Sequence, residues 1–123
     1  MKAMRTPDEP ALIGLRDELR AFASARDWDQ FHSPKNLAIA LSVEVSELLE
    51  HFLWQSDNDS FGISKDKLDA IDEEIADVFL YLIRIADKLS IDLVDAARRK
   101  ILMNARKYPV EKARGNAKKY TQL

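Results

Sequence analysis

Two pairs of acidic residues, each with three-residue spacing, carry the clearest chemical potential in this sequence. Glu44 and Glu47 lie in the stretch NLAIALSVEVSELLEHFLW, and Glu74 and Asp77 lie in EEIADVFLYLI. Residues three apart share one face of an α-helix, so each pair projects two carboxylates together from apolar surroundings. Two such helices packed antiparallel would bring four carboxylates to one point.

Four carboxylates at one point cannot all stay ionised unless a cation neutralises them. Ligation by oxygen alone selects a hard ion, so we expect Mg²⁺, with Mn²⁺ as a substitute. A di-iron bundle also turns carboxylates inward, but it uses Glu-x-x-His pairs. Neither acidic pair here ends in histidine, which favours Mg²⁺ over redox iron. A single pair of this kind, taken alone, is more typical of a solvated helix face than of a metal site.

Four amphipathic helices are predicted to position these acids. Apolar residues recur at helical spacing through most of the chain. Short links between long helices favour an up-and-down four-helix bundle in the all-α class. The helices expected over residues 33–54 and 65–89 are apolar around most of their circumference, which predicts that they are buried, either centrally or in a subunit interface. The expected helices span residues 6–27, 33–54, 65–89 and 92–108.

Capping patterns mark the ends of these helices. Thr6-Pro7-Asp8-Glu9 is a capping-box pattern, and Ser33-Pro34 combines an N-cap with proline at the first helical position. Asp92 is the expected N-cap of the fourth helix. Tyr108-Pro109 ends that helix, because proline disfavours helical geometry in the residue before it. From about residue 109 we expect a basic tail that becomes ordered only against a partner or ligand.

Composition indicates one helical domain spanning residues 1–123. The chain is 46% hydrophobic and 33% charged, with three glycines and four prolines. The lack of cysteine excludes disulfides and thiolate metal sites. The first six residues are polar and charged, and no apolar run reaches the roughly 18 to 20 residues that span a bilayer. We therefore expect a cytoplasmic protein with neither a signal peptide nor a membrane partner.

The net charge of −2 conceals a separation of acid from base along the chain. Up to Ala97 there are 10 Lys or Arg against 20 Asp or Glu, and from Arg98 onward there are 9 against 1. A basic end beside a carboxylate cluster suits a small polyanion bridged by a metal, such as a nucleoside triphosphate. The alternative is a non-catalytic helical interaction module whose basic tail binds nucleic acid or an acidic partner.

Aromatic and basic residues form two further groups with open interpretations. Trp28, His32 and Trp54 are either core or edge residues, or the walls of a slot in which a base stacks, formed across subunits or through the loop. A second set recurs at near helical spacing in the fourth helix. It forms either a solvated basic face or a grip for phosphate and sugar. Its members are Lys100, Asn104, Lys107 and Tyr108.

Three segments resemble the MazG-like, all-α nucleoside triphosphate pyrophosphatases, and among them the dCTP pyrophosphatase branch. They are RDWDQFHSPKNLAIALSVEVSELLEHFLW, EEIADVFLYLIRIADKLSIDL and KILMNARKYPVEKARGNAKKY, within residues 26–120. The four acids fill the Glu-x-x-Glu, spacer, Glu-x-x-Asp signature of that family. The resemblance implies hydrolysis of a (d)NTP to a nucleoside monophosphate and diphosphate. The implied substrate is dCTP or a modified relative, cleared from the nucleotide pool, with no nucleic acid as partner.

The resemblance also implies roles for individual residues. Glu44, Glu47, Glu74 and Asp77 would hold Mg²⁺ on the triphosphate, with Glu47 as the general base. The base pocket would use Trp28, His32 and Trp54, while Tyr81 and Asn104 contact sugar or base and Lys100, Lys107 and Tyr108 contact the phosphates. Members of this fold pair helices across subunits, which implies a homo-oligomer, either a dimer or a tetramer.

Overall fold

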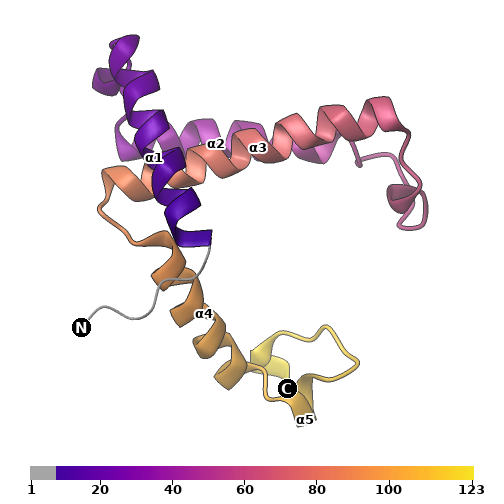
Figure 1. The fold of residues 1–123 in the computed structure, drawn as a ribbon. Helices are drawn as coiled ribbons and strands as arrows, with labels where there is room; N and C mark the ends of the chain where they lie inside the picture. Colours follow the sequence, from indigo (N-terminus) through magenta and orange to yellow (C-terminus); the bar gives the residue numbers. More distant parts are fainter. Residues whose placement is uncertain (1–7) are drawn as a thin grey trace. The chain divides into compact units, whose positions relative to one another are not determined.

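The structure is a computed structural model and describes residues 8–123. The described residues form helices and turns without any strand, which confirms the all-α class (Figure 1). None of the helices in this part of the chain is long and apolar enough to cross a membrane. The α helices are α1 (Asp8–Ala25), α2 (Pro34–Glu50), α3 (Lys65–Lys88), α4 (Leu93–Lys107) and α5 (Val110–Ala113), with short 3₁₀ helices η1 (Asp29–Phe31), η2 (Asp59–Phe61) and η3 (Tyr120–Gln122).

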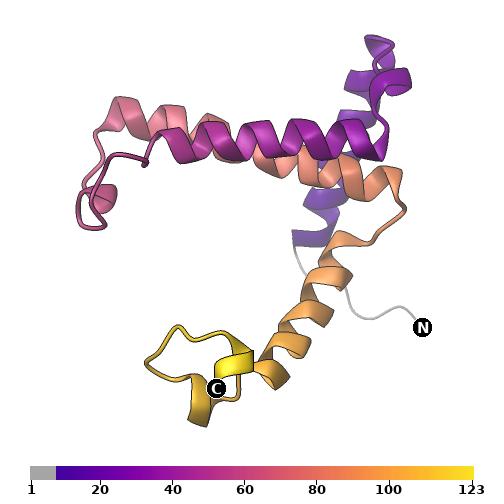
Figure 2. The same cartoon turned by 180° about the vertical axis from the view of Figure 1, so that it is seen from behind.

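The chain divides into two compact units, one that ends at Ser90 and one that spans Ile91–Leu123. In the first unit, α2 and α3 lie side by side and antiparallel, and α1 packs across α3 (Figures 1 and 2). Only small parts of these helices are fully buried within the single chain. The buried apolar residues among those described are Ala23, Leu37, Ile71, Ile83 and Ala86.

Two of the predicted helix caps are confirmed. The Ser33 hydroxyl oxygen accepts a hydrogen bond from the backbone N–H of Asn36 at 3.1 Å, which satisfies a donor that the first turn of α2 cannot pair internally. A carboxylate oxygen of Asp92 accepts in the same way from the N–H of Asp95 at 3.0 Å, at the start of α4. The capping pattern that begins at Thr6 falls partly outside the described residues and stays a prediction.

The predicted ends of the first two helices are too late. Helix α1 ends at Ala25 rather than near residue 27, because Asp27 adopts a left-handed backbone with φ of 54° that no helix continues through. Helix α2 ends at Glu50 rather than near Trp54. The N–H groups of His51 and Phe52 bond to carbonyls only three residues back, which tightens and closes the last turn.

The basic C-terminal segment has more structure than the sequence analysis predicted. It contains the one-turn helix α5 and the 3₁₀ helix η3. The rings of Tyr108 and Tyr120 meet edge to face at 6.1 Å between centroids, and the Lys107 ammonium lies 4.8 Å above the Tyr120 ring. These contacts tie η3 to the end of α4 within the second unit. Tyr108 caps α4 as predicted, and its N–H donates to the Asn104 carbonyl at 2.8 Å.

Candidate active site

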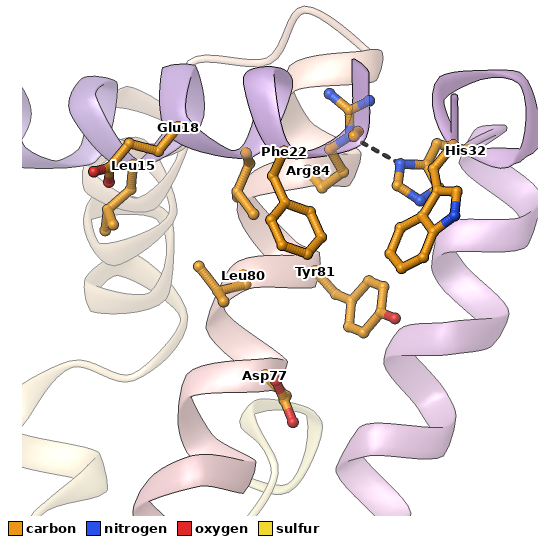
Figure 3. Close-up of a pocket in the computed structure, with 11 residues that line it drawn as sticks. Leu15, Glu18, Phe22, His32, Asp77, Leu80, Tyr81 and Arg84 are labelled. Carbon is orange, nitrogen blue, oxygen red and sulfur yellow. Dashed lines mark hydrogen bonds between the residues drawn. The ribbon is translucent and has the colours of Figure 1, made fainter. Parts of the chain in front are cut away.

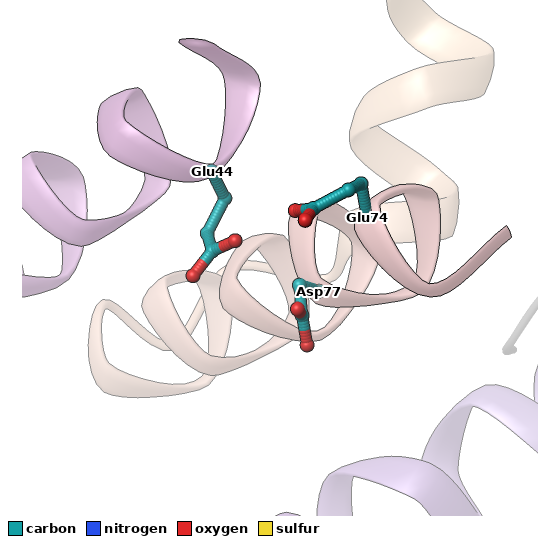
Figure 4. A group of neighbouring side chains, drawn as sticks. All are labelled: Glu44, Glu74 and Asp77. Atoms are coloured by element: carbon teal, nitrogen blue, oxygen red, sulfur yellow. The ribbon is translucent and has the colours of Figure 1, made fainter. Parts of the chain in front are cut away.

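The predicted acidic pairs do meet where α2 faces α3. One carboxylate oxygen from each of Glu44, Glu74 and Asp77 lies within 4.8 Å of the other two (Figure 4). Glu44 projects from α2, and Glu74 points toward it from α3, one turn from Asp77 on the same helix. The antiparallel packing of two helices with the same three-residue spacing is therefore enough to build this acidic cluster.

Glu47 lies next to these three acids and is half-buried. Its carboxylate is close enough to raise the pKa of both Glu44 and Glu74, although burial contributes more to each shift. Together, burial and the neighbouring acids raise the pKa of Glu44 to about 7. At neutral pH the carboxylates of the cluster are thus not all ionised unless a cation binds among them.

The acidic cluster fits a divalent cation. The Oε2 atoms of Glu44 and Glu74 are buried, and neither has a hydrogen-bond donor within the described chain. Buried carboxylate oxygens normally have such a donor, so these two atoms require a proton or a metal ion. All candidate ligand atoms here are oxygens, a donor set that suits hard ions.

A cavity of about 410 Å³ adjoins the acidic cluster within the first unit (Figure 3). Asp77 contributes both to the cluster and to the cavity wall. Most of the wall is apolar and comes from α1 and α3. The lining residues are Leu15, Glu18, Leu19, Phe22, Ala23, Trp28, His32, Asp77, Leu80, Tyr81 and Arg84.

Aromatic rings form one end of this cavity. Phe22 and Trp28 meet edge to face at 5.7 Å between centroids, and Trp28 meets His32 at 6.4 Å. Trp28 keeps 45% of its surface exposed, which leaves its ring available for a stacking partner. Burial raises the pKa of the Tyr81 hydroxyl, and the Glu44 and Asp77 carboxylates add to that shift. Tyr81 therefore stays a neutral hydroxyl between the aromatic end and the acids.

The chain has relatives among known proteins. The sequence pattern of the MazG-like family matches residues 39–123, which contain all four acids. The chain belongs to the MazG-like family. It is 42% identical over 117 residues to dCTP pyrophosphatase 1 of Homo sapiens, covering 94% of this chain and 69% of that protein. It is 41% identical over 125 residues to dCTP pyrophosphatase 1 of Mus musculus, covering 99% of this chain and 73% of that protein.

A solved structure agrees with this assignment. The crystal structure of a pyrophosphatase from Archaeoglobus fulgidus matches the MazG-like chain with a TM-score of 0.74 and 39% sequence identity. The match covers 89% of this chain and 98% of the archaeal one. The predicted resemblance, including its dCTP pyrophosphatase branch, is thereby confirmed.

The other residues that the sequence analysis assigned to the site are Trp54 and four residues of the second unit. Trp54 follows α2, is 92% exposed and does not line the cavity of its own chain. The remaining four belong to the second unit, on α4 and at its C-cap. They are Lys100, Asn104, Lys107 and Tyr108. Their proposed contacts with substrate stay predictions.

The structure adds site residues that the sequence analysis missed. Helix α1 supplies a wall of the cavity through Leu15, Glu18 and Phe22. The sequence showed that α1 is amphipathic, but not that its apolar face packs against α3 and lines the cavity. Arg84 also lines the cavity, although it is almost fully buried. A lone arginine inside the apolar run YLIRIA was the signal that could have identified it, since a buried cation needs nearby partners.

Proposed function

We propose that this protein is a Mg²⁺-dependent nucleoside triphosphate pyrophosphohydrolase that converts dCTP, or a modified relative, to the monophosphate and diphosphate. The broader class, a nucleotide pyrophosphatase, rests on the relatives at about 42% identity over most of the chain. One observation about this chain carries the narrower proposal. Asp77 belongs both to the acidic cluster, which suits a cation, and to the wall of the cavity, which suits a planar ring.

The acidic cluster is proposed to hold the ion through Glu44, Glu47, Glu74 and Asp77. When bound, Mg²⁺ or Mn²⁺ supplies neutralisation of phosphate charge and a lower pKa for the attacking water. Glu44 must release its proton for this, since its pKa is about 7 in the metal-free chain. Glu47 is proposed as the general base, because its carboxylate borders the cluster and accepts a proton from water there.

The cavity is proposed to receive the nucleobase. Trp28 offers a ring for stacking, and His32 and Tyr81 offer polar atoms beside it. Trp54 is proposed to reach the base of a neighbouring subunit, because it is exposed in its own chain. In the second unit, Asn104 is proposed to contact sugar or base. Lys100, Lys107 and Tyr108 are proposed to contact the phosphates.

Assembly into a dimer or tetramer is part of the proposal. Both helices that carry the acids expose large apolar side chains within the single chain, at positions such as Ile39, Val43, Ile75 and Phe79. Contiguous exposed apolar surface is typical of subunit interfaces. A second copy that covered these side chains would also exclude water around the acidic cluster. The cytoplasmic location stays a prediction.

The test is pyrophosphate release from a panel of dNTPs and NTPs, with Mg²⁺ and with EDTA. We expect metal-dependent release that is strongest with dCTP or a 5-substituted relative. Glu47→Gln should fold and lose at least about 100-fold in kcat, as expected for a general base. Glu50→Gln, on an exposed position of the same helix, should retain wild-type turnover.

Two outcomes would overturn the proposal. A Glu47→Gln variant with the wild-type rate would remove Glu47 from the reaction. If no triphosphate yielded pyrophosphate with any metal, the acidic cluster would have to be structural. The non-catalytic interaction module would then be favoured, and it predicts salt-sensitive binding of nucleic acid or an acidic partner.

A further inference from the structure

Arg84 is a buried cation whose guanidinium contacts three other residues. Its side chain lies on α3 and only 5% of the residue is exposed. Its Nη2 donates to the Asp29 carboxylate at 2.8 Å, and its Nη1 lies 3.6 Å from the Asp87 carboxylate. Its Nε donates to His32 Nδ1 at 3.1 Å (Figure 3). The two carboxylates offset the charge, and the planar guanidinium is fixed in one orientation.

This geometry determines where His32 carries its proton. A guanidinium can only donate hydrogen bonds, so the His32 Nδ1 that receives the bond must be unprotonated. A neutral His32 then carries its proton on Nε2. That atom has no hydrogen-bond partner within the described part of the chain, and the ring lines the cavity. The cavity wall therefore contains an available N–H donor.

We propose that Arg84 is a positioning residue that holds His32 in its Nε2–H tautomer, so that the cavity presents a fixed hydrogen-bond donor to an acceptor atom of the nucleobase. The identity of the ligand rests on the proposed function, whereas the tautomer does not. The opposite tautomer would present an acceptor from Nε2. It would select an exocyclic amino group in place of a carbonyl or an unprotonated ring nitrogen.

The charged groups around His32 favour its neutral form. Burial, Arg84 and Lys88 on α3 lower the pKa of His32, in that order, and Asp29 on η1 opposes them. Asp29 is itself committed to both cations, because it accepts from Arg84 and from Lys88. The donor on Nε2 thus arises from a neutral ring rather than from an imidazolium.

The tautomer can be measured directly in the wild-type chain by NMR. The sequence contains two histidines, so His51→Gln assigns the ¹⁵N signals of the His32 ring. Long-range ¹H–¹⁵N correlation should show a single neutral species at pH 7, with the proton on Nε2. A proton on Nδ1, a mixture of the two tautomers, or an imidazolium at pH 7 would overturn the proposal.

Two variants separate positioning from general charge effects. Arg84→Met removes the donor to His32, whereas Lys88→Met removes a nearby cation that, among the described residues, bonds to Asp29 and not to His32. We expect Arg84→Met to give a mixture of tautomers and Lys88→Met to keep the single one. We also expect Arg84→Met to raise KM for dCTP by the reciprocal of the fraction of His32 that keeps its proton on Nε2, about twofold for an equal mixture, with kcat unchanged. Lys88→Met should leave KM at the wild-type value.

Unchanged tautomer and KM in Arg84→Met would overturn the positioning role. If that variant does not fold, the wild-type spectrum decides the tautomer alone. If the wild-type protein releases no pyrophosphate, the proposed function fails, and the nucleobase part of this proposal fails with it. Comparison of the wild-type and Arg84→Met spectra would still decide whether Arg84 sets the tautomer.

Discussion

Glu44 and Glu74 form part of the proposed metal site, but without a cation their placement lowers the stability of the folded chain. Each has a buried carboxylate oxygen without a donor among residues 8–123, and each lies beside further acids. Burial is the first cause of the raised pKa of both residues, followed by Glu47. The ionised cluster destabilises the folded chain until a cation joins it, so metal binding and stability should be linked.

Glu44→Gln should therefore have opposite effects on stability and on metal binding. It removes an ionisable group from the cluster, so we expect the metal-free variant to melt at a higher temperature than the wild type at pH 7.5 in EDTA. Mn²⁺ affinity, measured by isothermal titration calorimetry, should fall at least about tenfold, because one ligand charge is lost. Glu50→Gln is the matched control and should change neither quantity. A lower melting temperature for Glu44→Gln in EDTA would contradict the strained cluster.

The raised pKa of Glu44 also predicts a pH dependence. Its pKa of about 7 lies above its ordinary value of 4.5, so between these values the folded metal-free chain binds more protons than the unfolded chain. The free energy of unfolding in EDTA should thus fall as pH rises from about 4.5 to about 7. Urea unfolding at pH 5.5 and 7.5 should show a larger loss for the wild type than for Glu44→Gln. Equal losses would show that Glu44 does not titrate in this range.

Metal binding should follow the opposite pH trend. Coordination requires the ionised Glu44 carboxylate, so Mn²⁺ affinity should increase as pH rises through about 7 and then level off. Calorimetric titrations at pH 6 and pH 8 measure this change. An affinity that is independent of pH over this interval would show that Glu44 is not a ligand.

At the scale of elements, the sequence predicted what depends on local patterns. The three-residue spacing of the acids predicted their meeting across α2 and α3, and Ser33 and Asp92 predicted two helix starts. The end of α2 was placed too late, because Trp54 and the residues before it continue an apolar pattern after the backbone has left the helix. Arg84 was missed because its partners come from other segments, which a pattern within one helix does not reveal.

The cap of α2 gives a test at this scale. Ser33→Ala removes the acceptor for the Asn36 N–H, so we expect a loss of about 1 kcal/mol in the free energy of unfolding, measured in urea. Ser42→Ala is the matched control in the same helix. The Ser42 hydroxyl bonds to the Ile39 carbonyl within the helix, and alanine is the better helix former there, so stability should be unchanged or higher. Equal losses in both variants would refute the capping role.

At the scale of the whole molecule, the exposed apolar surface of α3 is the main unexplained feature of a single chain. Leu68, Ile75, Phe79 and Leu82 recur at spacings of seven, four and three residues, and all four are at least 38% exposed. They share one face of the helix, so they form a continuous apolar stripe. The predicted helices over residues 33–54 and 65–89, expected to be buried either centrally or in a subunit interface, are largely exposed in the single chain, so their burial in an interface stays a prediction. The single domain over residues 1–123 also stays a prediction, because the structure divides at Ser90.

Leu68→Glu tests this assembly. A charge in the apolar stripe should lower the molar mass measured by light scattering after gel filtration, from a dimer or tetramer toward a smaller species. Lys65→Glu, at an exposed position in the first turn of the same helix, should keep the wild-type mass. A wild-type protein that is monomeric at micromolar concentration would refute the oligomer.

The products formed from dCTP test the central claim most directly. With Mg²⁺ present, chromatography and a diphosphate assay should find dCMP and diphosphate in equal amounts, and EDTA should abolish both. That result is expected if the acidic cluster and the adjoining cavity together place the α-phosphate for attack. Formation of dCDP and inorganic phosphate, or product formation that persists in EDTA, would contradict a metal-dependent pyrophosphohydrolase.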